Sequence, residues 1–240
     1  MVRIFVKNVL NEDMRFSPDP EEAHYLMSVI RMRDGEELVV VDGKGMVFNA
    51  SIKECGKKGC VIELSGTVKE SHEMQTRITL YQSVSKGERM DMTIQKSVEL
   101  GVYRIVPVIS ERCVVRLDGK KDKSERWQKI ALEAARQSGR DIVPVVTEPV
   151  PFAEAVRSAS DSIKVIPWEE ASGVDLKDVI GGRRPAGISV FIGPEGGYTP
   201  SETDMARAAG IVPVTLGSRI LRTETAGPAV LAMINYELEM

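Results

Sequence analysis

Between residues 1 and 72, apolar residues come in short runs that are separated by glycine-containing turns. Runs of this length that are rich in β-branched residues predict strands. The predicted strands cover residues 2–6, 37–42, 47–53 and 60–63. A short helix is expected at residues 20–31. The pattern suits a small β-rich domain that folds as a compact barrel.

From residue 77 onward, the pattern changes to strands that alternate with helices. The predicted strands cover residues 78–83, 103–109, 143–146 and 162–166, and the predicted helices cover residues 89–100, 124–138 and 176–180. Gly101 is expected to end the first of these helices in a left-handed conformation. Alternation of this kind indicates a parallel sheet covered by helices, so the expected fold class is α/β. We therefore expect two domains, at residues 1–72 and 73–240.

The carboxy-terminal region contains two units in which an apolar strand runs into a glycine-containing loop that opens a helix. In the first unit, the strand at residues 189–192 ends at the sequence Gly-Pro-Glu-Gly-Gly. Thr199 stands at the N-cap position, Pro200 at the first helical position and Glu202 three residues after the cap, which is a capping-box signature. This helix is expected to end at Gly210.

The second unit repeats this order, with a strand at residues 211–216 and a loop at residues 217–222. Thr223 or Thr225 can cap the final helix, which runs through residues 229–238. Two such loops side by side form a pocket. The sequence contains neither a GxGxxG motif after a strand nor a P-loop, so the common nucleotide-binding fingerprints are absent.

Composition narrows the range of chemistry. The chain has 240 residues, 42% hydrophobic content and a net charge of −3. Nothing at the amino terminus resembles a signal peptide and no apolar segment approaches the length of a membrane span, so a cytoplasmic protein is expected. Cys55, Cys60 and Cys113 form no CxxC pair, and His24 and His72, the two histidines, lie in or next to the first domain. We therefore expect no metal site, and no histidine-dependent nucleophile in the second domain.

Several blocks of the sequence resemble a known family. The segments GPEGG and LGSRILRTETA are similar to the two signature loops of SPOUT methyltransferases, and their spelling is closest to the RsmE family. HYLMSVIRMRDGEELVVVDGKGMVF, SKGERMDMTIQKSVELGV and EAARQSGR also resemble family blocks. The resemblance implies an S-adenosylmethionine-dependent enzyme that methylates N3 of a uridine in 16S ribosomal RNA. It also implies a homodimer, an amino-terminal PUA-like RNA-binding domain and a carboxy-terminal trefoil knot, where ordinary topology rules predict an unknotted sheet.

The two carboxy-terminal loops suit this cofactor, because exposed backbone groups can bind adenine and ribose while apolar side chains enclose the ring. Glycines let the backbone approach closely. Glu195 can bind the ribose hydroxyls or cap its own turn. The expected cofactor-binding residues are Ile192, Gly193, Glu195, Gly196, Leu216, Gly217, Ile220, Leu221, Thr223, Thr225 and Ala226.

Methyl transfer to uracil N3 requires that the developing uracil anion be stabilised or that a base remove the N3 proton. Arg222 is the leading candidate for anion stabiliser, because it stands between the second loop and the final helix. The alternative is a salt bridge from Arg222 to Glu224 or Glu195. Glu224 is expected to orient other groups rather than act as the base, since a helix N-terminus lowers the pKa of a nearby carboxylate.

Basic residues concentrate between residues 112 and 140, where nine lysines and arginines stand against four acidic residues. This stretch can bind RNA phosphates or form a solvated helix face. The resemblance implies RNA contacts for Arg3, His24, Arg31, Arg33, Arg136, Gln137, Ser138 and Arg140. Arg31 and Arg33 can instead hydrogen-bond the last carbonyls of a helix. Lys86, Glu88 and Arg89 lie either near the substrate entrance or at a helix cap.

Two other functions stay open from the sequence. One is a noncatalytic RNA-binding or ribosome-assembly protein that keeps the fold, against which the intact glycines and the LRTETA block argue. The other is a SPOUT methyltransferase that acts on another RNA, such as tRNA. The block at residues 24–48 favours the RsmE-like branch over this second alternative.

Overall fold

The computed structural model describes residues 2–6, 14–56, 59–68, 71–114, 120–171 and 173–239, with only the backbone described at 120–122. The chain divides into two compact units. The first unit consists of Met1–Glu73 and Ala135–Val143, and the second of Met74–Ala134 and Pro144–Met240. The return of a short later segment to the first unit was not anticipated from the sequence. The expected domain boundary at residues 72/73 stays a prediction.

The first unit is built on a mixed sheet whose strand order is β1-β3-β4-β5-β2 in the described residues. The strands are β1 (Val2–Phe5), β2 (Arg15–Phe16), β3 (Glu37–Val41), β4 (Val47–Gly56) and β5 (Gly59–Thr67). Only the β1–β3 pairing is parallel among the pairings seen. Its core contains Ile4, Leu26, Leu38, Val40, Phe48, Ile52, Ile62 and Leu64. The four predicted strands are confirmed, and β2 is an addition.

The predicted helix of the first unit forms in two parts. Helix α1 (Pro20–His24) continues into a π-helical segment, η1 (Tyr25–Ile30). Arg31 ends this segment in a left-handed conformation with φ of 62°, and its backbone N–H donates to the carbonyl of Leu26. That five-residue hydrogen bond is the wider pattern of a π-helix. The sequence predicted a helix over these residues but not the change from α-helical to π-helical hydrogen bonding.

The second unit contains a parallel sheet whose main path runs β12-β10-β11-β6-β7-β8, with β9 paired to β7. Its described strands are β6 (Arg77–Ser83), β7 (Arg104–Ile109), β8 (Val145–Val146), β9 (Val150–Pro151), β10 (Ile163–Pro167), β11 (Gly187–Ile192) and β12 (Val212–Val214). Strand β11 lies between β6 and β10. Strand β10 in turn lies between β11 and β12, so the carboxyl ends of these three strands meet at one edge of the sheet.

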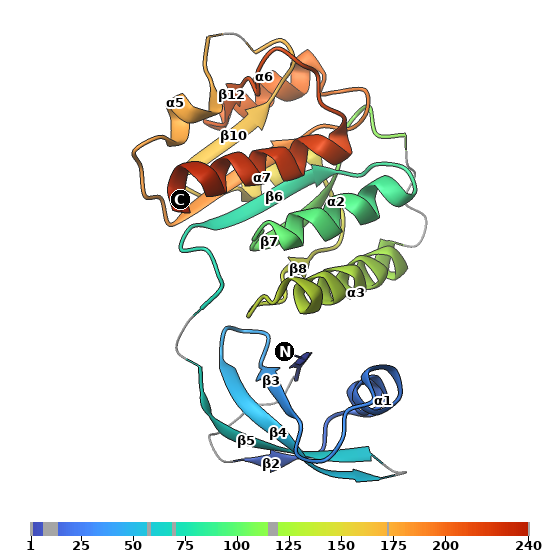
Figure 1. Cartoon of the computed structure of the whole chain (residues 1–240). Coiled ribbons are helices and arrows are strands. Elements are labelled where there is room, and N and C mark those ends of the chain that lie inside the picture. Colours follow the sequence, from blue (N-terminus) through green and yellow to red (C-terminus); the bar gives the residue numbers. More distant parts are fainter. Residues whose placement is uncertain are drawn as a thin grey trace. The chain divides into compact units, whose positions relative to one another are not determined.

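Helices cover this sheet on both faces (Figure 1). They are α2 (Glu88–Glu99), α3 (Lys120–Ser138), α4 (Phe152–Ser158), α5 (Leu176–Ile180), α6 (Pro200–Ala208) and α7 (Thr223–Glu239). Helices α2 and α7 contact each other, and α7 lies on β6 and β11, whereas α4 contacts α6 and β7. The predicted α/β alternation is confirmed. Helix α4 was not predicted, and no helix of the described residues is long and apolar enough to cross a membrane.

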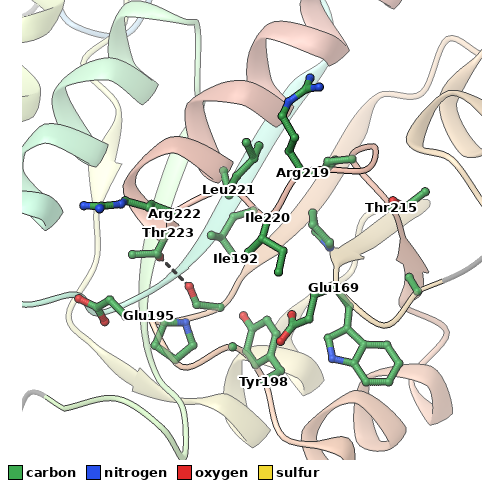
Figure 2. Close-up of a pocket in the computed structure, with 18 of the residues that line it drawn as sticks. Glu169, Ile192, Glu195, Tyr198, Thr215, Arg219, Ile220, Leu221, Arg222 and Thr223 are labelled. Carbon is green, nitrogen blue, oxygen red and sulfur yellow. Dashed lines mark hydrogen bonds between the residues drawn. The ribbon is translucent and has the colours of Figure 1, made fainter.

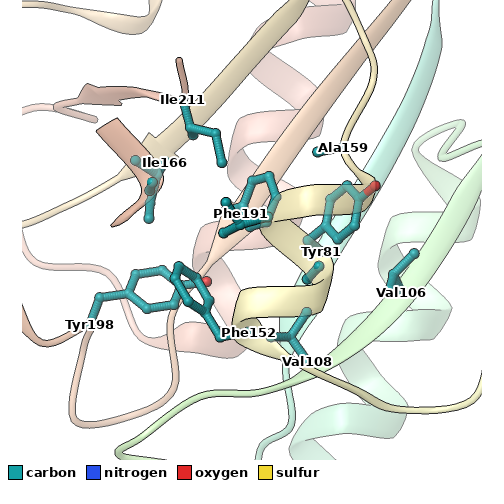
Figure 3. Close-up of a cluster of buried hydrophobic side chains, with 12 residues drawn as sticks. Tyr81, Val106, Val108, Phe152, Ala159, Ile166, Phe191, Tyr198 and Ile211 are labelled. Atoms are coloured by element: carbon teal, nitrogen blue, oxygen red, sulfur yellow. The ribbon is translucent and has the colours of Figure 1, made fainter. Parts of the chain in front are cut away.

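An aromatic cluster packs between the sheet and α4 and includes a residue of the loop after β11 (Figure 3). The rings of Tyr81 and Phe191 stack with their centroids 4.3 Å apart. Phe152 of α4 contacts Phe191 and also Tyr198, whose ring centroid is 5.0 Å away. Because Tyr198 is only 2% exposed, the loop that precedes it is held by the core at this end.

The helix caps predicted from the sequence are largely confirmed. Thr199 and Glu202 form the capping box at the start of α6, with Thr199 N donating to Glu202 Oε2 at 2.9 Å. Gly101 follows α2 with φ of +86°. The final helix differs from the prediction, because α7 begins at Thr223 and the carbonyl of Arg222 accepts from the amides of its first turn. Thr223 is therefore the first residue of the helix rather than its cap, and its hydroxyl donates instead to the carbonyl of Gly193.

Candidate functional site

A cavity of about 820 Å³ lies at the carboxyl ends of the neighbouring strands β10, β11 and β12 (Figure 2). The segments that line it follow each of these strands directly. In open α/β sheets, ligands bind at this edge, where loops present backbone groups to a crevice. The position of the cavity is therefore a consequence of the strand order, which brings residues 167–171, 192–198 and 215–226 together.

The first lining loop, residues 193–198, is fixed from both sides. Thr223 Oγ1 donates to the carbonyl of Gly193 at 2.6 Å, the bond marked in Figure 2. Buried Gln82 donates in turn to Thr223 Oγ1 at 2.9 Å. An Arg112 guanidinium nitrogen donates to the carbonyl of Gly196 at 2.8 Å. Together with the buried ring of Tyr198, these bonds hold the loop in one conformation.

The second lining loop, residues 215–222, turns sharply at Gly217, whose φ is +104°. Leu216 and Leu221 of this loop are half-buried, whereas other side chains of the loop are open to solvent. Ile220 is 86% exposed, and Arg219 and Arg222 are also exposed. Within the described residues, neither arginine forms an ion pair. The salt bridge from Arg222 to Glu224 or Glu195, which was the alternative to a catalytic role, is not formed among them.

Arg89, and not Arg222, forms the ion pairs with Glu195 and Glu224. Its guanidinium lies 3.0 Å from Glu195 and 3.8 Å from Glu224. Burial alone would raise the pKa of Glu195, but the backbone amides of Glu195 and Lys86 and the Arg89 guanidinium outweigh burial and lower that pKa. Glu224 Oε2 is buried and has no hydrogen-bond partner among the described residues. Arg89 thus ties two carboxylates to one wall of the cavity.

The structure brings nearly all predicted cofactor-binding residues to this cavity. Those that line it are Ile192, Gly193, Glu195, Gly196, Leu216, Gly217, Ile220, Leu221, Thr223 and Ala226, together with Arg222 and Glu224. Thr225 is exposed and does not line it. Lining a cavity is not the same as binding a ligand, so the roles of these residues stay predictions.

Sequence reasoning missed the third wall of the cavity. Pro167, Trp168, Glu169 and Ala171 follow β10 and line the cavity, as do Arg89, Tyr198 and Arg219. The strand before this wall was predicted, but its end was treated as an ordinary loop. The missing information was the strand order, which places β10 between β11 and β12.

Three of the arginines predicted to contact RNA form ion pairs inside the first unit. Arg3 pairs with Asp141 at 2.5 Å and also donates to the carbonyl of Arg140. Arg136 pairs with Glu22, and its guanidinium lies 5.3 Å from the centre of the Tyr25 ring. Arg140 pairs with Glu73. These contacts give the three arginines a role in the fold, and their RNA contacts stay predictions.

The other residues predicted to contact RNA lie on the surface. They are His24, Arg31, Arg33, Gln137 and Ser138, all exposed. Part of the basic stretch cannot be placed, because Arg116 and the side chains of Lys120 and Lys121 lie outside the described residues. Across the residues that are described, no three His, Cys, Asp or Glu side chains are arranged to hold a metal ion.

Comparison with known proteins identifies the class. Residues 72–235 match the family model of the RNA methyltransferase domain, and residues 18–65 match that of the RNA methyltransferase PUA domain. The chain thus belongs to the class of RNA methyltransferases that carry a PUA domain.

Individual relatives narrow the class to one family. Ribosomal RNA small subunit methyltransferase E of Bacillus subtilis is 34% identical over 100% of this chain and 98% of its own length. The same enzyme of Buchnera aphidicola is 30% identical over 97% of this chain and 92% of its own. A crystal structure of ribosomal RNA small subunit methyltransferase E from Neisseria gonorrhoeae, bound to S-adenosyl methionine, superposes with a TM-score of 0.92 at 37% identity, covering 99% and 98% of the two chains. The chain belongs to the ribosomal RNA small subunit methyltransferase E family, RsmE.

Proposed function

We propose that this protein transfers a methyl group from S-adenosylmethionine to N3 of a uridine in 16S ribosomal RNA of the small subunit. Family membership supports the reaction class, and a related structure holds this cofactor. The observation that carries the proposal is the cavity at the ends of β10, β11 and β12, with its two glycine-containing loops. The protein would act in the cytoplasm, where ribosomal subunits are assembled.

The residues of the cavity fit S-adenosylmethionine. Its volume of about 820 Å³ falls within the roughly 300–1,000 Å³ of small-molecule sites. Ile192, Leu216, Ile220 and Leu221 supply apolar surface for the adenine ring. A Cβ at Gly193 would lie 3.3 Å from the Tyr198 ring, which is a tight contact, so glycine suits the close packing of the loop on that ring. When bound, the cofactor supplies a methyl group on an already activated sulfonium.

The cationic side of the cavity suits a reaction that leaves negative charge on uracil. Loss of the N3 proton places charge on the flanking carbonyl oxygens, and an aimed guanidinium stabilises it. Arg222 is exposed at the cavity and forms no ion pair among the described residues, so its charge is available to the substrate. Glu224, which lies 3.8 Å from Arg89, would orient the neighbouring groups.

For RNA binding, the first unit would act as a PUA-like module, with its boundary at residue 72. His24, Arg31 and Arg33 are exposed there and can reach phosphates or bases. Arg3, Arg136 and Arg140 would support this surface mainly from within, because each is engaged in an internal ion pair. Such contacts to phosphate position the RNA, and base contacts would select the uridine.

The trefoil knot and the homodimer belong to the same proposal. In support of the knot, the chain leaves β12, passes the cavity and returns in α7, which lies on β6 and β11. In support of the dimer, the adjacent helices α2 and α7 expose Met92, Met233 and Tyr236, which are 51%, 42% and 72% exposed. Burial of such side chains against a second copy is favourable.

Light scattering tests the dimer. Tyr236→Asp should convert a dimer to a monomer, since a buried charge disfavours the interface. Met205→Asp is the control, because Met205 is 42% exposed on α6, away from the α2–α7 face. A monomeric wild-type protein would remove the homodimer from the proposal.

The reaction is tested by methyl transfer from labelled S-adenosylmethionine to small ribosomal subunits that lack the modification. Nucleoside analysis of the recovered 16S RNA should give N3-methyluridine. Free 16S RNA and tRNA are run in parallel, so that label on tRNA alone would favour a different substrate. Cofactor binding without transfer to any of these RNAs would favour a noncatalytic RNA-binding or ribosome-assembly protein.

A further inference from the structure

The turn after β10 places a carboxylate in the cavity that neither signature loop supplies. Glu169 lines the cavity two residues beyond the end of β10. Its backbone is held on both sides, since Trp168 N donates to the Val214 carbonyl at 3.1 Å and Ala171 N to the Trp168 carbonyl at 3.0 Å. The Arg207 guanidinium lies 5.1 Å from the centre of the Trp168 ring. The side chain of Glu169 therefore projects from a fixed turn.

This carboxylate lies against the first glycine loop (Figure 2). A Cβ added at Gly197 would be 2.5 Å from Glu169 Oε1, closer than real atoms approach. Gly197 also has φ of +67°, a conformation that other residues adopt only with strain. The absence of a side chain at residue 197 thus leaves space for the Glu169 carboxylate between the β10 turn and the β11 loop.

The three acidic residues that line the cavity differ in what they bind. Glu195 Oε1 accepts from Arg89 at 3.0 Å and from the Lys86 amide at 3.4 Å. Glu224 lies in the field of Arg89, 3.8 Å away, and is only 13% exposed. Glu169 is exposed and forms neither a hydrogen bond nor an ion pair within the described part of the chain. Of the three carboxylates, Glu169 alone is both exposed and unpaired among the described residues, whereas Glu224 is nearly buried beside Arg89.

We propose that Glu169, and not Glu195, binds the ribose hydroxyls of the adenosyl group. The inference rests on the proposed use of S-adenosylmethionine. A vicinal diol presents two O–H donors, and a carboxylate with two open oxygens can accept both. In other α/β folds an acidic residue near a strand end binds a ribose hydroxyl in the same way. Glu195, whose oxygen already takes two donors, would instead hold Arg89 in place.

Comparing three ligands shows which part of the cofactor a residue binds. S-adenosylhomocysteine carries the adenosine and the amino acid, 5′-methylthioadenosine lacks the amino acid, and 2′-deoxy-5′-methylthioadenosine also lacks one ribose hydroxyl. Calorimetry gives the Kd of each for wild type, Glu169→Gln and the control Glu170→Gln. Glu170 is a suitable control because it is the adjacent exposed glutamate and does not line the cavity.

Glu169→Gln removes a charged acceptor, so it should raise the Kd of S-adenosylhomocysteine and of 5′-methylthioadenosine alike, by about tenfold. The same substitution should matter much less for the 2′-deoxy ligand, so that the two losses are not additive. Glu170→Gln should change none of the three constants.

Two results overturn the proposal. Equal affinities in Glu169→Gln and wild type would show that Glu169 does not bind the cofactor, and a loss confined to S-adenosylhomocysteine would place the carboxylate at the amino-acid end. Both leave the proposed function intact, because wild type still binds. If wild-type protein binds none of these ligands and transfers no methyl group, the proposed function itself fails.

Discussion

The first unit and the cavity of the second unit use arginine in opposite ways. In the first unit the side chains of Arg3, Arg136 and Arg140 are 11%, 10% and 5% exposed, and each pairs with a buried or nearly buried carboxylate. At the cavity Arg219 and Arg222 are exposed and, among the described residues, form no ion pair. A buried arginine whose charge is already compensated supports the fold, whereas an exposed arginine without an ion pair keeps its charge available for a substrate.

The largest effect should come from breaking a buried pair. Arg140→Ala removes the partner of Glu73, whose side chain is only 12% exposed, and uncompensated buried charges typically cost about 3–5 kcal/mol of folding free energy. Urea unfolding monitored by circular dichroism measures the loss. Arg15→Ala is the control in the same unit, because Arg15 is 65% exposed in its pair with Glu63 and such pairs contribute up to about 1 kcal/mol. Equal losses in the two variants would contradict the division between the two uses of arginine.

The opposite result is expected for Arg222→Ala. Removing a donor that stabilises charge in the transition state typically lowers kcat by about 10²–10³-fold, while an exposed substitution changes stability by less than about 0.5 kcal/mol. Single-turnover methyl transfer, the Kd of S-adenosylhomocysteine and urea unfolding give the three quantities. Cofactor affinity should stay the same.

Two variants make this test specific. Arg222→Lys keeps the charge without the planar guanidinium and should retain part of the activity. Arg184→Ala removes another exposed arginine, outside the cavity, and should behave as wild type. If Arg222→Ala turned over normally, the anion-stabilising role would be lost.

The sequence was most informative where local physical chemistry decides the structure. The capping box at Thr199 and Glu202, the left-handed Gly101 and the strand runs depend on neighbouring residues, so periodicity and turn residues predicted them. The two glycine loops were found for the same reason. That they belong to a methyltransferase came from their resemblance to a family, not from periodicity.

What the sequence could not supply was information about distant partners. Whether Arg140 faces RNA or Glu73 depends on a residue 67 positions away, and charge counting treats both cases alike. Arg89 was left between two roles, because its carboxylate partners follow it by more than a hundred residues. Glu169 was missed because only the strand order places β10 beside β11. The domain boundary, the knot, the dimer and the site roles stay predictions.

Acidification should lower the contribution of the buried Asp141 carboxylate to the free energy of unfolding. Burial alone would raise the pKa of Asp141, but the His72 amide and Arg3 outweigh it and lower that pKa. The stabilisation is therefore present above the unfolded-state pKa of about 3.9 and is lost as the pH falls through the lower folded-state pKa. Asp141→Asn should cost roughly 1–3 kcal/mol at pH 7, and this difference from wild type should shrink below about pH 4.

Urea unfolding at several pH values between neutrality and acid measures this difference. Glu54→Gln is the control, since Glu54 is an exposed carboxylate on β4. Its difference from wild type should be small and flat with pH. A pH-independent penalty for Asp141→Asn would mean that packing, and not the charge, accounts for the effect.

The smallest effect is expected at Arg31, an exposed arginine that could both end a helix and contact RNA. Arg31 is exposed and has φ of 62°, a conformation that costs a residue with a Cβ roughly 1–2 kcal/mol. Arg31→Gly should relieve this strain and raise stability by up to about 1 kcal/mol, whereas Arg31→Ala should leave it nearly unchanged.

If the Arg31 guanidinium contacts an RNA phosphate, both variants should bind small-subunit RNA more weakly, and the slope of log affinity against log salt should fall by about one. Filter binding across salt concentrations, with Arg184→Ala as the control, separates the two properties. Unchanged affinity and an unchanged salt slope in both variants would remove Arg31 from the RNA surface.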